Sequence, residues 1–192
     1  ILLESAGSLS TRFNENAGVI KSWNYRRAWN DTVELFYPVI IDNMMNLEML
    51  LHASNVSGNQ QYRDIAVQHA NTTLENHFRN DFSTYHVVDY DTIAGDVLYR
   101  MTSQGYSDNS TWARGQAWAI YGFTMMYRET GDEKYLHAAT AAADWYLSHL
   151  DTDDPVPCWD FNVDQEGYEP EEKSYALHFR EKHKDASAAA IT

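Results

Sequence analysis

The 192-residue chain contains one cysteine, four prolines and half as many cationic as acidic side chains. A single cysteine, Cys158, excludes an internal disulfide, so the fold does not depend on oxidation. No run of 18 apolar residues occurs, and the sequence therefore predicts no membrane-spanning helix. The 14 lysines and arginines against 28 aspartates and glutamates give a net charge of −14. This charge disfavours nucleic acid as a partner, because its binders carry a basic face.

The sequence also lacks the motifs of several common functions. It contains no GxSxG, P-loop or dinucleotide-binding motif. The eight histidines include no HExxH or comparable ligand spacing, so we predict neither a metal nor a cofactor. Asp89, Asp91 and Asp96 do not have the spacing of a twelve-residue calcium loop, and we interpret them as turn residues.

Aromatic residues, in contrast, are plentiful. They make up 14% of the chain and include six tryptophans and thirteen tyrosines. This is more ring surface than the core of one domain of this length needs, and it predicts a cleft lined with rings. In so acidic a chain, an anionic substrate would need a local cation to hold it.

A repeat of helix pairs organises the chain. The segment that begins at Gly58 aligns without gaps with the segment that begins at Gly131, and both are amphipathic at helical spacing, as surface helices are. Each follows a segment that is apolar nearly all round, residues 42–51 and 112–127, which predicts a buried helix. A third copy begins after Asp185, a residue typical of a helix N-cap.

Alternating buried and surface helices predict an all-α toroid or solenoid of helical hairpins. The buried helices would be parallel, so we expect Asp42, Trp112, Arg114, Gln116 and Asp185 to converge at one face. A plain array of α-hairpins without a site is the alternative, but it does not require polar residues to cluster at the helix starts. The alternation in residues 83–91 predicts a short β-hairpin over one end of the helices. The long connection at 150–173 is of the kind that covers a site.

Asp42 has two interpretations of equal weight. Its apolar neighbours would raise the pKa of the carboxyl towards that of a general acid, while the helix N-terminus would oppose this shift. Alternatively, Asp42 is an ordinary N-cap.

The other polar and aromatic candidates also have more than one interpretation each. His86 either binds a substrate hydroxyl or is structural, and Trp112 and Trp118 either line a sugar site or belong to the core. Arg114, beside a buried helix, needs a partner, which would be a substrate carboxylate, Asp42 or another protein acid.

Five segments together are specific enough to indicate a family. They are "SLSTRFNENAGVIKSW", "YPVIIDNMMNLEML", "STYHVVDYD", "QGYSDNSTWARGQAWAIYGF" and "KDASAAA". In this order they resemble the unsaturated glucuronyl hydrolases of glycoside hydrolase family 88. The related unsaturated rhamnogalacturonyl hydrolases match them less well.

The resemblance implies an (α/α)6 barrel that removes a 4,5-unsaturated uronic acid from oligosaccharides left by polysaccharide lyases, without a cofactor. It implies that Asp42 is the general acid and base. It further implies that His86, Gln104, Trp112 and Arg114 contact the sugar and that Trp118 supports the pocket. A second aspartate of the family, in a His-Asp-hydrophobic motif, is absent from these 192 residues. We therefore expect residues 1–192 to form part of one catalytic domain that continues outside them.

Two other functions remain possible on the sequence alone. A carbohydrate-binding protein would keep the tryptophans and the arginine without turnover, and a lyase on the same toroid would cleave by β-elimination. The expected setting is the cytoplasm or periplasm of a bacterium. The sequence selects neither an oligomeric state nor a particular glycosaminoglycan, linkage or sulfation pattern.

Overall fold

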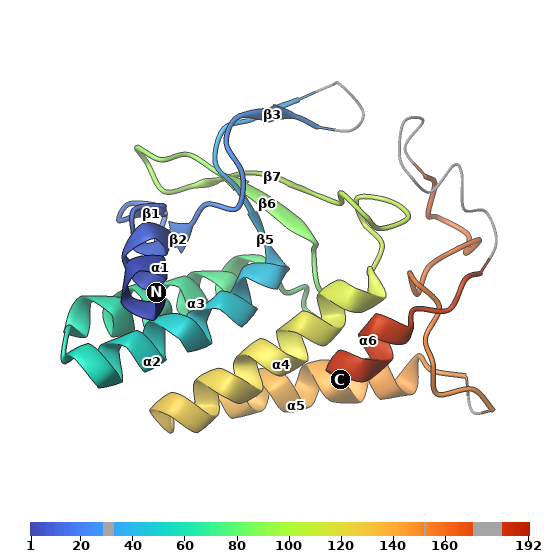
Figure 1. Ribbon diagram of the computed structural model, residues 1–192. Helices are drawn as coiled ribbons and strands as arrows, with labels where there is room; N and C mark the ends of the chain where they lie inside the picture. The colour runs from blue at the N-terminus through green and yellow to red at the C-terminus, as the bar shows by residue number, and fades with distance from the viewer. Residues whose placement is uncertain (29–32, 152, 171–181) are drawn as a thin grey trace.

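The computed structural model of the protein describes residues 1–28, 33–151, 153–170 and 182–192 (Figure 1). In these ranges the helices are α1 (Leu2–Ser10), the 3₁₀ helix η1 (Ile41–Asn46), α2 (Leu47–Ser57), α3 (Gln60–Asn76), α4 (Ala113–Thr130), α5 (Glu133–Ser148) and α6 (Ala186–Ile191). The strands are β1 (Phe13–Asn14), β2 (Val19–Ile20), β3 (Arg26–Arg27), β4 (Glu34–Leu35), β5 (Pro38–Ile40), β6 (Val87–Tyr90) and β7 (Val97–Met101).

Two helical hairpins, α2–α3 and α4–α5, form the body of the molecule. Gly58 and Gly131 end α2 and α4 in the left-handed conformation, with φ of 72° and 70°, which a glycine adopts without strain. The side chains of Asn59 and Asp132 then accept hydrogen bonds from the backbone of the next helix and cap α3 and α5. The structure thus has the predicted repeat, down to its turn residues.

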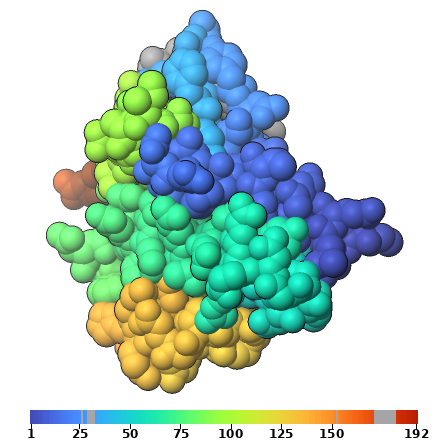
Figure 2. Space-filling view, turned by 90° about the vertical axis from the view of Figure 1, so that its left-hand side faces the viewer, coloured from blue at the N-terminus to red at the C-terminus, as the bar shows by residue number. Residues whose placement is uncertain are grey.

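The main core lies where these four helices meet. Figure 2 shows α3 (green) lying directly against α5 (orange), and the Tyr135 hydroxyl of α5 donates to Asn71 of α3 at 2.7 Å. α4 is buried along most of its length because glycines and alanines let its neighbours approach. A Cβ added to Gly122 would overlap the Cβ of Met44 in η1. The core side chains include Leu47, Leu50, Leu51, Ala66, Ala119, Phe123, Met126 and Ala138.

The first buried helix differs from its prediction over 42–51. It starts as the 3₁₀ helix η1 and becomes α-helical only at Leu47, continuing to Ser57. In this turn the buried side chain of Asn43 donates to the carbonyl of Ile20 at 2.7 Å. This long-range bond fixes the turn in a tighter geometry than an α-helix.

A three-stranded antiparallel sheet in the order β5–β6–β7 covers one end of the helices (Figure 1). A hairpin is present at the predicted end, but only β6 lies within the predicted residues 83–91, and its partner β7 follows at Val97–Met101. The third strand, β5, was not predicted. β5 pairs with β6 through Ile40 opposite Val87, and the amide of Ile41 donates to the carbonyl of His86 at 3.0 Å. The sheet consequently places the start of η1 beside His86.

The acidic residues of this sheet differ from the prediction at one position. Asp91 accepts from the backbone of Ile93 and is a turn residue, as expected. Asp89 instead lies inside β6, fully buried, and accepts from the amide of Tyr37 at 2.8 Å. Burial raises the pKa of Asp89. Asp89 is therefore a strand residue, and its carboxylate binds the backbone just before β5.

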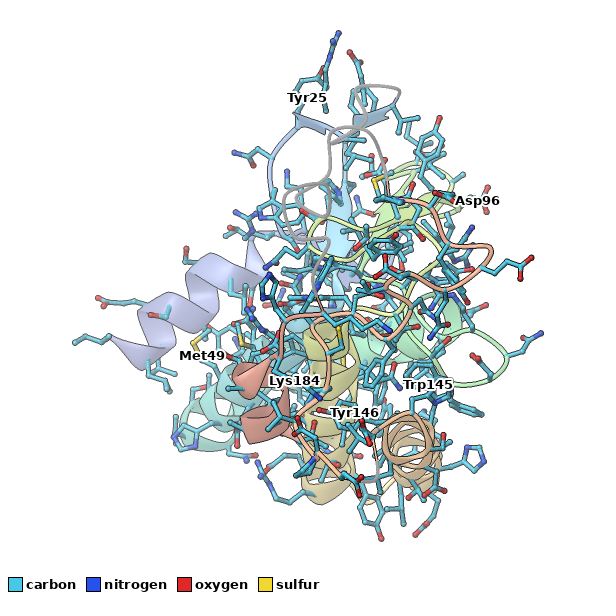
Figure 3. The ribbon with its side chains drawn as sticks, turned by 90° about the vertical axis from the view of Figure 1, so that its right-hand side faces the viewer. Tyr25, Met49, Asp96, Trp145, Tyr146 and Lys184 are labelled. Carbon is cyan, nitrogen blue, oxygen red and sulfur yellow. The ribbon has the colours of Figure 1, made fainter. Side chains whose placement is uncertain are left out.

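The connection after α5 packs on that helix and on the start of α4. The ring of Phe161 meets Trp145 and Tyr146, whose positions Figure 3 marks, with centroids 5.1 and 5.3 Å apart. The backbone of Asp160 pairs with Trp112. The described part of the predicted covering segment 150–173 thus lies over the N-terminus of α4, and residues 152 and 171–173 are outside the described residues. No helix in the described ranges is long and apolar enough to cross a membrane.

Candidate active site

Asp42, the second residue of η1, has a largely enclosed carboxyl. Its side chain is 14% exposed, and burial raises the pKa of Asp42 to about 6. Its own backbone amide and the charge of Arg114 act in the opposite direction, with smaller effects. No side-chain hydrogen bond caps η1. Of the two interpretations of Asp42, the structure therefore supports the buried acid, because the Asp42 side chain does not cap the helix.

His86, the residue before β6, is oriented by the backbone of a neighbouring loop. Its Nδ1 accepts from the amides of Ser103 at 3.1 Å and Gln104 at 3.2 Å. Because Nδ1 is an acceptor, the proton of the neutral ring belongs on Nε2. Nε2 lies 3.8 Å from Oδ2 of Asp42. The loop thereby fixes both the orientation and the tautomer of the ring that faces the acid.

Trp112 precedes α4 and packs against the ring of His86, tilted by 31°. The two ring centroids are 4.3 Å apart, and the indole is 4% exposed. Gly115 makes this contact possible, because a Cβ there would lie 3.1 Å from the indole and 3.3 Å from Ile41. The guanidinium carbon of Arg114 is 5.4 Å from the indole centroid. An acid, an imidazole, an indole and a guanidinium therefore follow one another across the ends of η1, β6 and α4.

Arg114 has a protein acid as its partner. Its Nη2 and Nε lie 2.9 and 3.2 Å from Oδ2 of Asp185, whose other oxygen accepts from the amide of Ala188 at 2.9 Å. Asp185 is thus the predicted N-cap of α6. It is also the protein acid that neutralises Arg114. The arginine side chain is still 35% exposed.

The remaining predicted residues lie outside this group of four side chains. Gln104 contributes its backbone amide to His86, and its side chain is exposed. Trp118, one turn beyond Arg114, is half-buried and meets Tyr121 edge-on at 5.8 Å. Gln116 was expected at this face and is not there. It is fully buried, and its amide donates to the carbonyls of Phe82 and Ala142, because its position on α4 faces α5.

Asp160 holds the loop that orients His86, a role the sequence did not reveal. It is completely buried, and its carboxylate accepts from the amide of Tyr106 at 2.8 Å, the hydroxyl of Ser110 at 2.6 Å and the amide of Asn162 at 2.9 Å. Burial raises the pKa of Asp160. The one available signal was an acid between two large rings in "CWDFN".

Arg79 is a second residue of this kind. Its guanidinium donates to the carbonyls of Thr84 at 2.9 Å, Asn109 at 2.9 Å and Ser110 at 3.0 Å. It also lies over the ring of Tyr85 at 3.8 Å. Arg79 therefore joins the segment before His86 to the loop before Trp112.

The chemistry available here is proton transfer. A carboxyl whose pKa is near 6 can exist in both protonation states near neutral pH, as a group that acts as both acid and base must. The flat indole suits the apolar face of a sugar ring, and the guanidinium suits an anion. Within the described residues, no group of three or more His, Cys, Asp or Glu is arranged to hold a metal ion.

Comparison with known proteins identifies relatives along the whole chain. The profile of Glycosyl Hydrolase Family 88 matches residues 6–129. An unsaturated glucuronyl hydrolase of Formosa agariphila is 49% identical over 193 residues, which cover all of this chain and 44% of that protein. An unsaturated chondroitin disaccharide hydrolase of Streptococcus pyogenes is 35% identical, over 82% of this chain and 38% of that protein.

Solved structures give the same result. The crystal structure of an unsaturated glucuronyl hydrolase specific for heparin superposes with a TM-score of 0.84 at 41% identity, over 99% of this chain and 46% of that one. The chain has part of the fold of the (α/α)6 barrel glycosidases, as the family resemblance implied, and the helical repeat had predicted a toroid or solenoid of helical hairpins. The chain belongs to glycoside hydrolase family 88. It spans less than half the length of the relatives it matches.

Proposed function

We propose that the protein removes a 4,5-unsaturated uronic acid from the non-reducing end of lyase-generated oligosaccharides of the glycosaminoglycan type. The observation that carries this proposal is the buried carboxyl of Asp42, whose Oδ2 lies 3.8 Å from Nε2 of His86 and whose pKa burial raises to about 6. Membership of a family whose relatives are named for this reaction supports it. In this proposal the chain supplies part of one catalytic domain. The bacterial origin of both relatives fits the expected bacterial setting.

In the proposed reaction one carboxyl acts twice. The unsaturated ring is an enol ether, and neutral Asp42 donates its proton to C4, which leaves a cation shared by C5 and the ring oxygen. The Asp42 carboxylate then takes a proton from a water molecule whose oxygen bonds to C5. The resulting hemiketal opens at the ring oxygen, and the hemiacetal left at C1 releases the rest of the saccharide. Ordinary glycosidases need two carboxyls for these tasks.

The neighbouring residues have separate roles in this proposal. Trp112 packs on His86 and borders the sugar, and the Nε2–H of His86 donates to a sugar hydroxyl or to the Asp42 carboxylate. Asp185 engages Nε and Nη2 of Arg114, which leaves the Nη1 donors for the carboxylate of the uronate. Gln104, through its exposed side chain, contacts the sugar, and Trp118 on α4 supports the pocket.

The test is to incubate the full-length protein with unsaturated heparin and chondroitin disaccharides and follow the ultraviolet absorbance of the C4=C5 bond. Hydration should remove this absorbance, whereas a lyase acting on the parent polysaccharide would increase it. Asp42→Asn should abolish turnover and retain binding. Binding without any loss of absorbance, on every unsaturated uronide tried, would identify a carbohydrate-binding protein and refute the proposal.

A further inference from the structure

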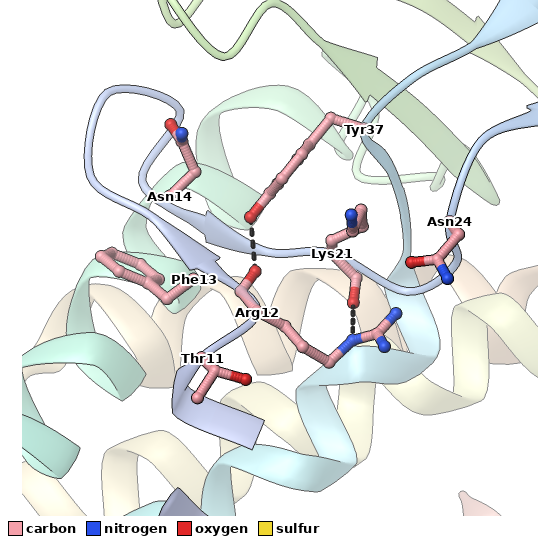
Figure 4. A pocket seen from close by; sticks show the side chains of 7 residues that line it. All are labelled: Thr11, Arg12, Phe13, Asn14, Lys21, Asn24 and Tyr37. Carbon is pink, nitrogen blue, oxygen red and sulfur yellow. Dashed lines mark hydrogen bonds between the residues drawn. The ribbon is translucent and has the colours of Figure 1, made fainter. Parts of the chain in front are cut away.

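A pocket with two cations lies away from the site described above, at the open end of the β1–β2 hairpin (Figure 4). It has a volume of about 300 Å³ and is lined by Arg12, Asn14, Lys21, Asn24 and Tyr37, among others. None of its lining residues is acidic. In a chain with a net charge of −14, a cavity lined by two cations and no carboxylate is a local exception.

The pocket is held in shape by bonds to the backbone. The hydroxyl of Tyr37 donates to the carbonyl of Arg12, and the Arg12 guanidinium donates from Nε to the carbonyl of Lys21 at 2.7 Å, as Figure 4 shows. Its Nη2 donates to the carbonyl of Ser22, also at 2.7 Å. The guanidinium is therefore fixed before any ligand arrives.

Both cations keep donors for a ligand. Two of the five N–H groups of Arg12 are engaged by carbonyls, and three remain. Nζ of Lys21 lies 5.4 Å from the centre of the Tyr37 ring. Within the described part of the chain neither cation forms an ion pair with a carboxylate, in contrast to Arg114, Arg128 and Lys134. A guanidinium and an ammonium on one cavity match the oxygens of a sulfate or a carboxylate.

The pocket is also connected to the segment that carries Asp42. Ser22, whose carbonyl binds Arg12, donates its amide to Pro38 and accepts from the amide of Ile40 through its hydroxyl at 2.9 Å. Ile40 lies two residues before Asp42. The hairpin and the sheet lie on the same side of the helices (Figure 1). The hairpin is therefore held against β5, the strand that leads into η1 and Asp42.

We propose that the Arg12–Lys21 pocket binds an anionic group, a sulfate or a carboxylate, on an outlying sugar of the oligosaccharide whose terminal uronate lies at Asp42. The oligosaccharide as the source of the anion rests on the proposed function, whereas the binding of an anion does not. The pocket would make the protein prefer sulfated or acidic chains longer than a disaccharide.

Lys21→Met tests this proposal, because Nζ of Lys21 makes no hydrogen bond within the described chain while its stem can still cover Tyr37. Lys134→Met, which removes the same charge from an exposed helix start, is the control. KM would be measured on unsaturated tetrasaccharides of equal length with and without sulfate and on the unsulfated disaccharide, and binding of inorganic sulfate would be titrated separately. We expect Lys21→Met to raise KM about tenfold, as for one charge-assisted hydrogen bond, and to leave KM on the disaccharide unchanged. The rise should be confined to the sulfated tetrasaccharide if the pocket binds sulfate and should occur on both tetrasaccharides if it binds the carboxylate of an internal uronate.

Three outcomes would overturn the inference. Equal KM values for Lys21→Met and the parent on all substrates would remove the pocket from binding, and an equal rise on all of them would indicate a structural effect. If Lys21→Met weakens the binding of inorganic sulfate but does not change KM on any saccharide, the pocket is an anion site unrelated to the substrate. Failure of the proposed function is distinct, since the parent protein would then turn over none of these substrates whatever Lys21 does.

Discussion

Nη2 of Arg114 lies 2.9 Å from Oδ2 of Asp185, and this ion pair joins the first turn of α4 to the first turn of α6. The carboxylate is almost fully buried, and it caps α6 at the same time. An asparagine can keep the cap but cannot carry the charge. Asp185→Asn therefore isolates the ion pair from the cap.

We expect Asp185→Asn to lower the free energy of unfolding by about 1.5–3 kcal/mol, the usual contribution of a hydrogen bond to a charged group. Urea unfolding of the full-length protein measures this change. Asp132→Asn is the matched control, because Asp132 caps α5 and pairs with Lys134 at 2.8 Å on an exposed surface. It should change stability little. Because both variants keep their caps, equal losses would show that the burial of the Arg114–Asp185 pair adds nothing to stability.

Asp42 should make the protein less stable when it ionises. Its pKa of about 6 is raised above the value of 3.8 in an unfolded chain, so its contribution to stability is complete below pH 3.8 and is lost as the pH rises through 6. Asp42→Asn should therefore increase the free energy of unfolding by about 3 kcal/mol at pH 8 and by less than about 1 kcal/mol near pH 4. Denaturant titrations at the two pH values test this, and the exposed Asp96→Asn should show no such difference. A gain independent of pH would contradict the buried-acid interpretation.

Local signals predicted the hairpins and the caps, and they did not reveal the long-range bonds. Gly58, Gly131 and Asp185 have characteristic neighbours, so their turns and caps could be read from the sequence. The repeat placed Arg114 and Asp185 at one face, but no local signal selects Asp185, 71 residues away, over Asp42 or a substrate carboxylate as the partner of Arg114. The same holds for Asp160, which binds a backbone amide 54 residues away.

Two further differences have similar causes. β5 has only three residues, too few to show alternation, and it is a strand because β6 lies beside it. The sequence could not predict that Gln116 is buried while Arg114 faces the site, because both are polar residues in the first turn of one helix. The packing of α4 on α5 decides which of them is buried.

The activity should depend on the protonation of Asp42. Above a pH of about 6 the neutral carboxyl becomes scarce, so kcat/KM should fall about tenfold per pH unit. Because the charge of Arg114 lowers the pKa of Asp42, Arg114→Met should move this limb to higher pH, and Arg114→Lys, which keeps the charge, should move it less. A pH profile of kcat/KM for the three proteins measures the position of the limb separately from the loss of rate. An unchanged limb in Arg114→Met would exclude this electrostatic coupling.

Asp160→Asn should release the loop that orients His86. The asparagine amide would present N–H groups to the amides or the hydroxyl that now donate to the carboxylate, so we expect a loss of about 2–4 kcal/mol. Amide hydrogen exchange at Tyr106 and Asn162 should accelerate well beyond the rest of the loop. Asp154→Asn, in the exposed part of the same connection, is the control and should leave both amides protected. Unchanged exchange in Asp160→Asn would place the support of the loop elsewhere.

Two buried histidines should make the fold sensitive to acid. His69 accepts from the amide of Ile20 at 3.0 Å, and burial lowers the pKa of His69 to about 3 and that of His77 to about 4. Both values lie below the 6.5 of an unfolded chain, so the stability they contribute is complete above pH 6.5 and is lost as the pH falls towards 4. Each should cost about 2 kcal/mol at pH 5. In His69→Gln the difference in unfolding free energy between pH 7 and pH 5 should shrink by that amount. In the exposed variant His52→Gln it should stay as in the parent protein, and an equal shrinkage in both variants would mean that the buried position of His69 has no part in the effect.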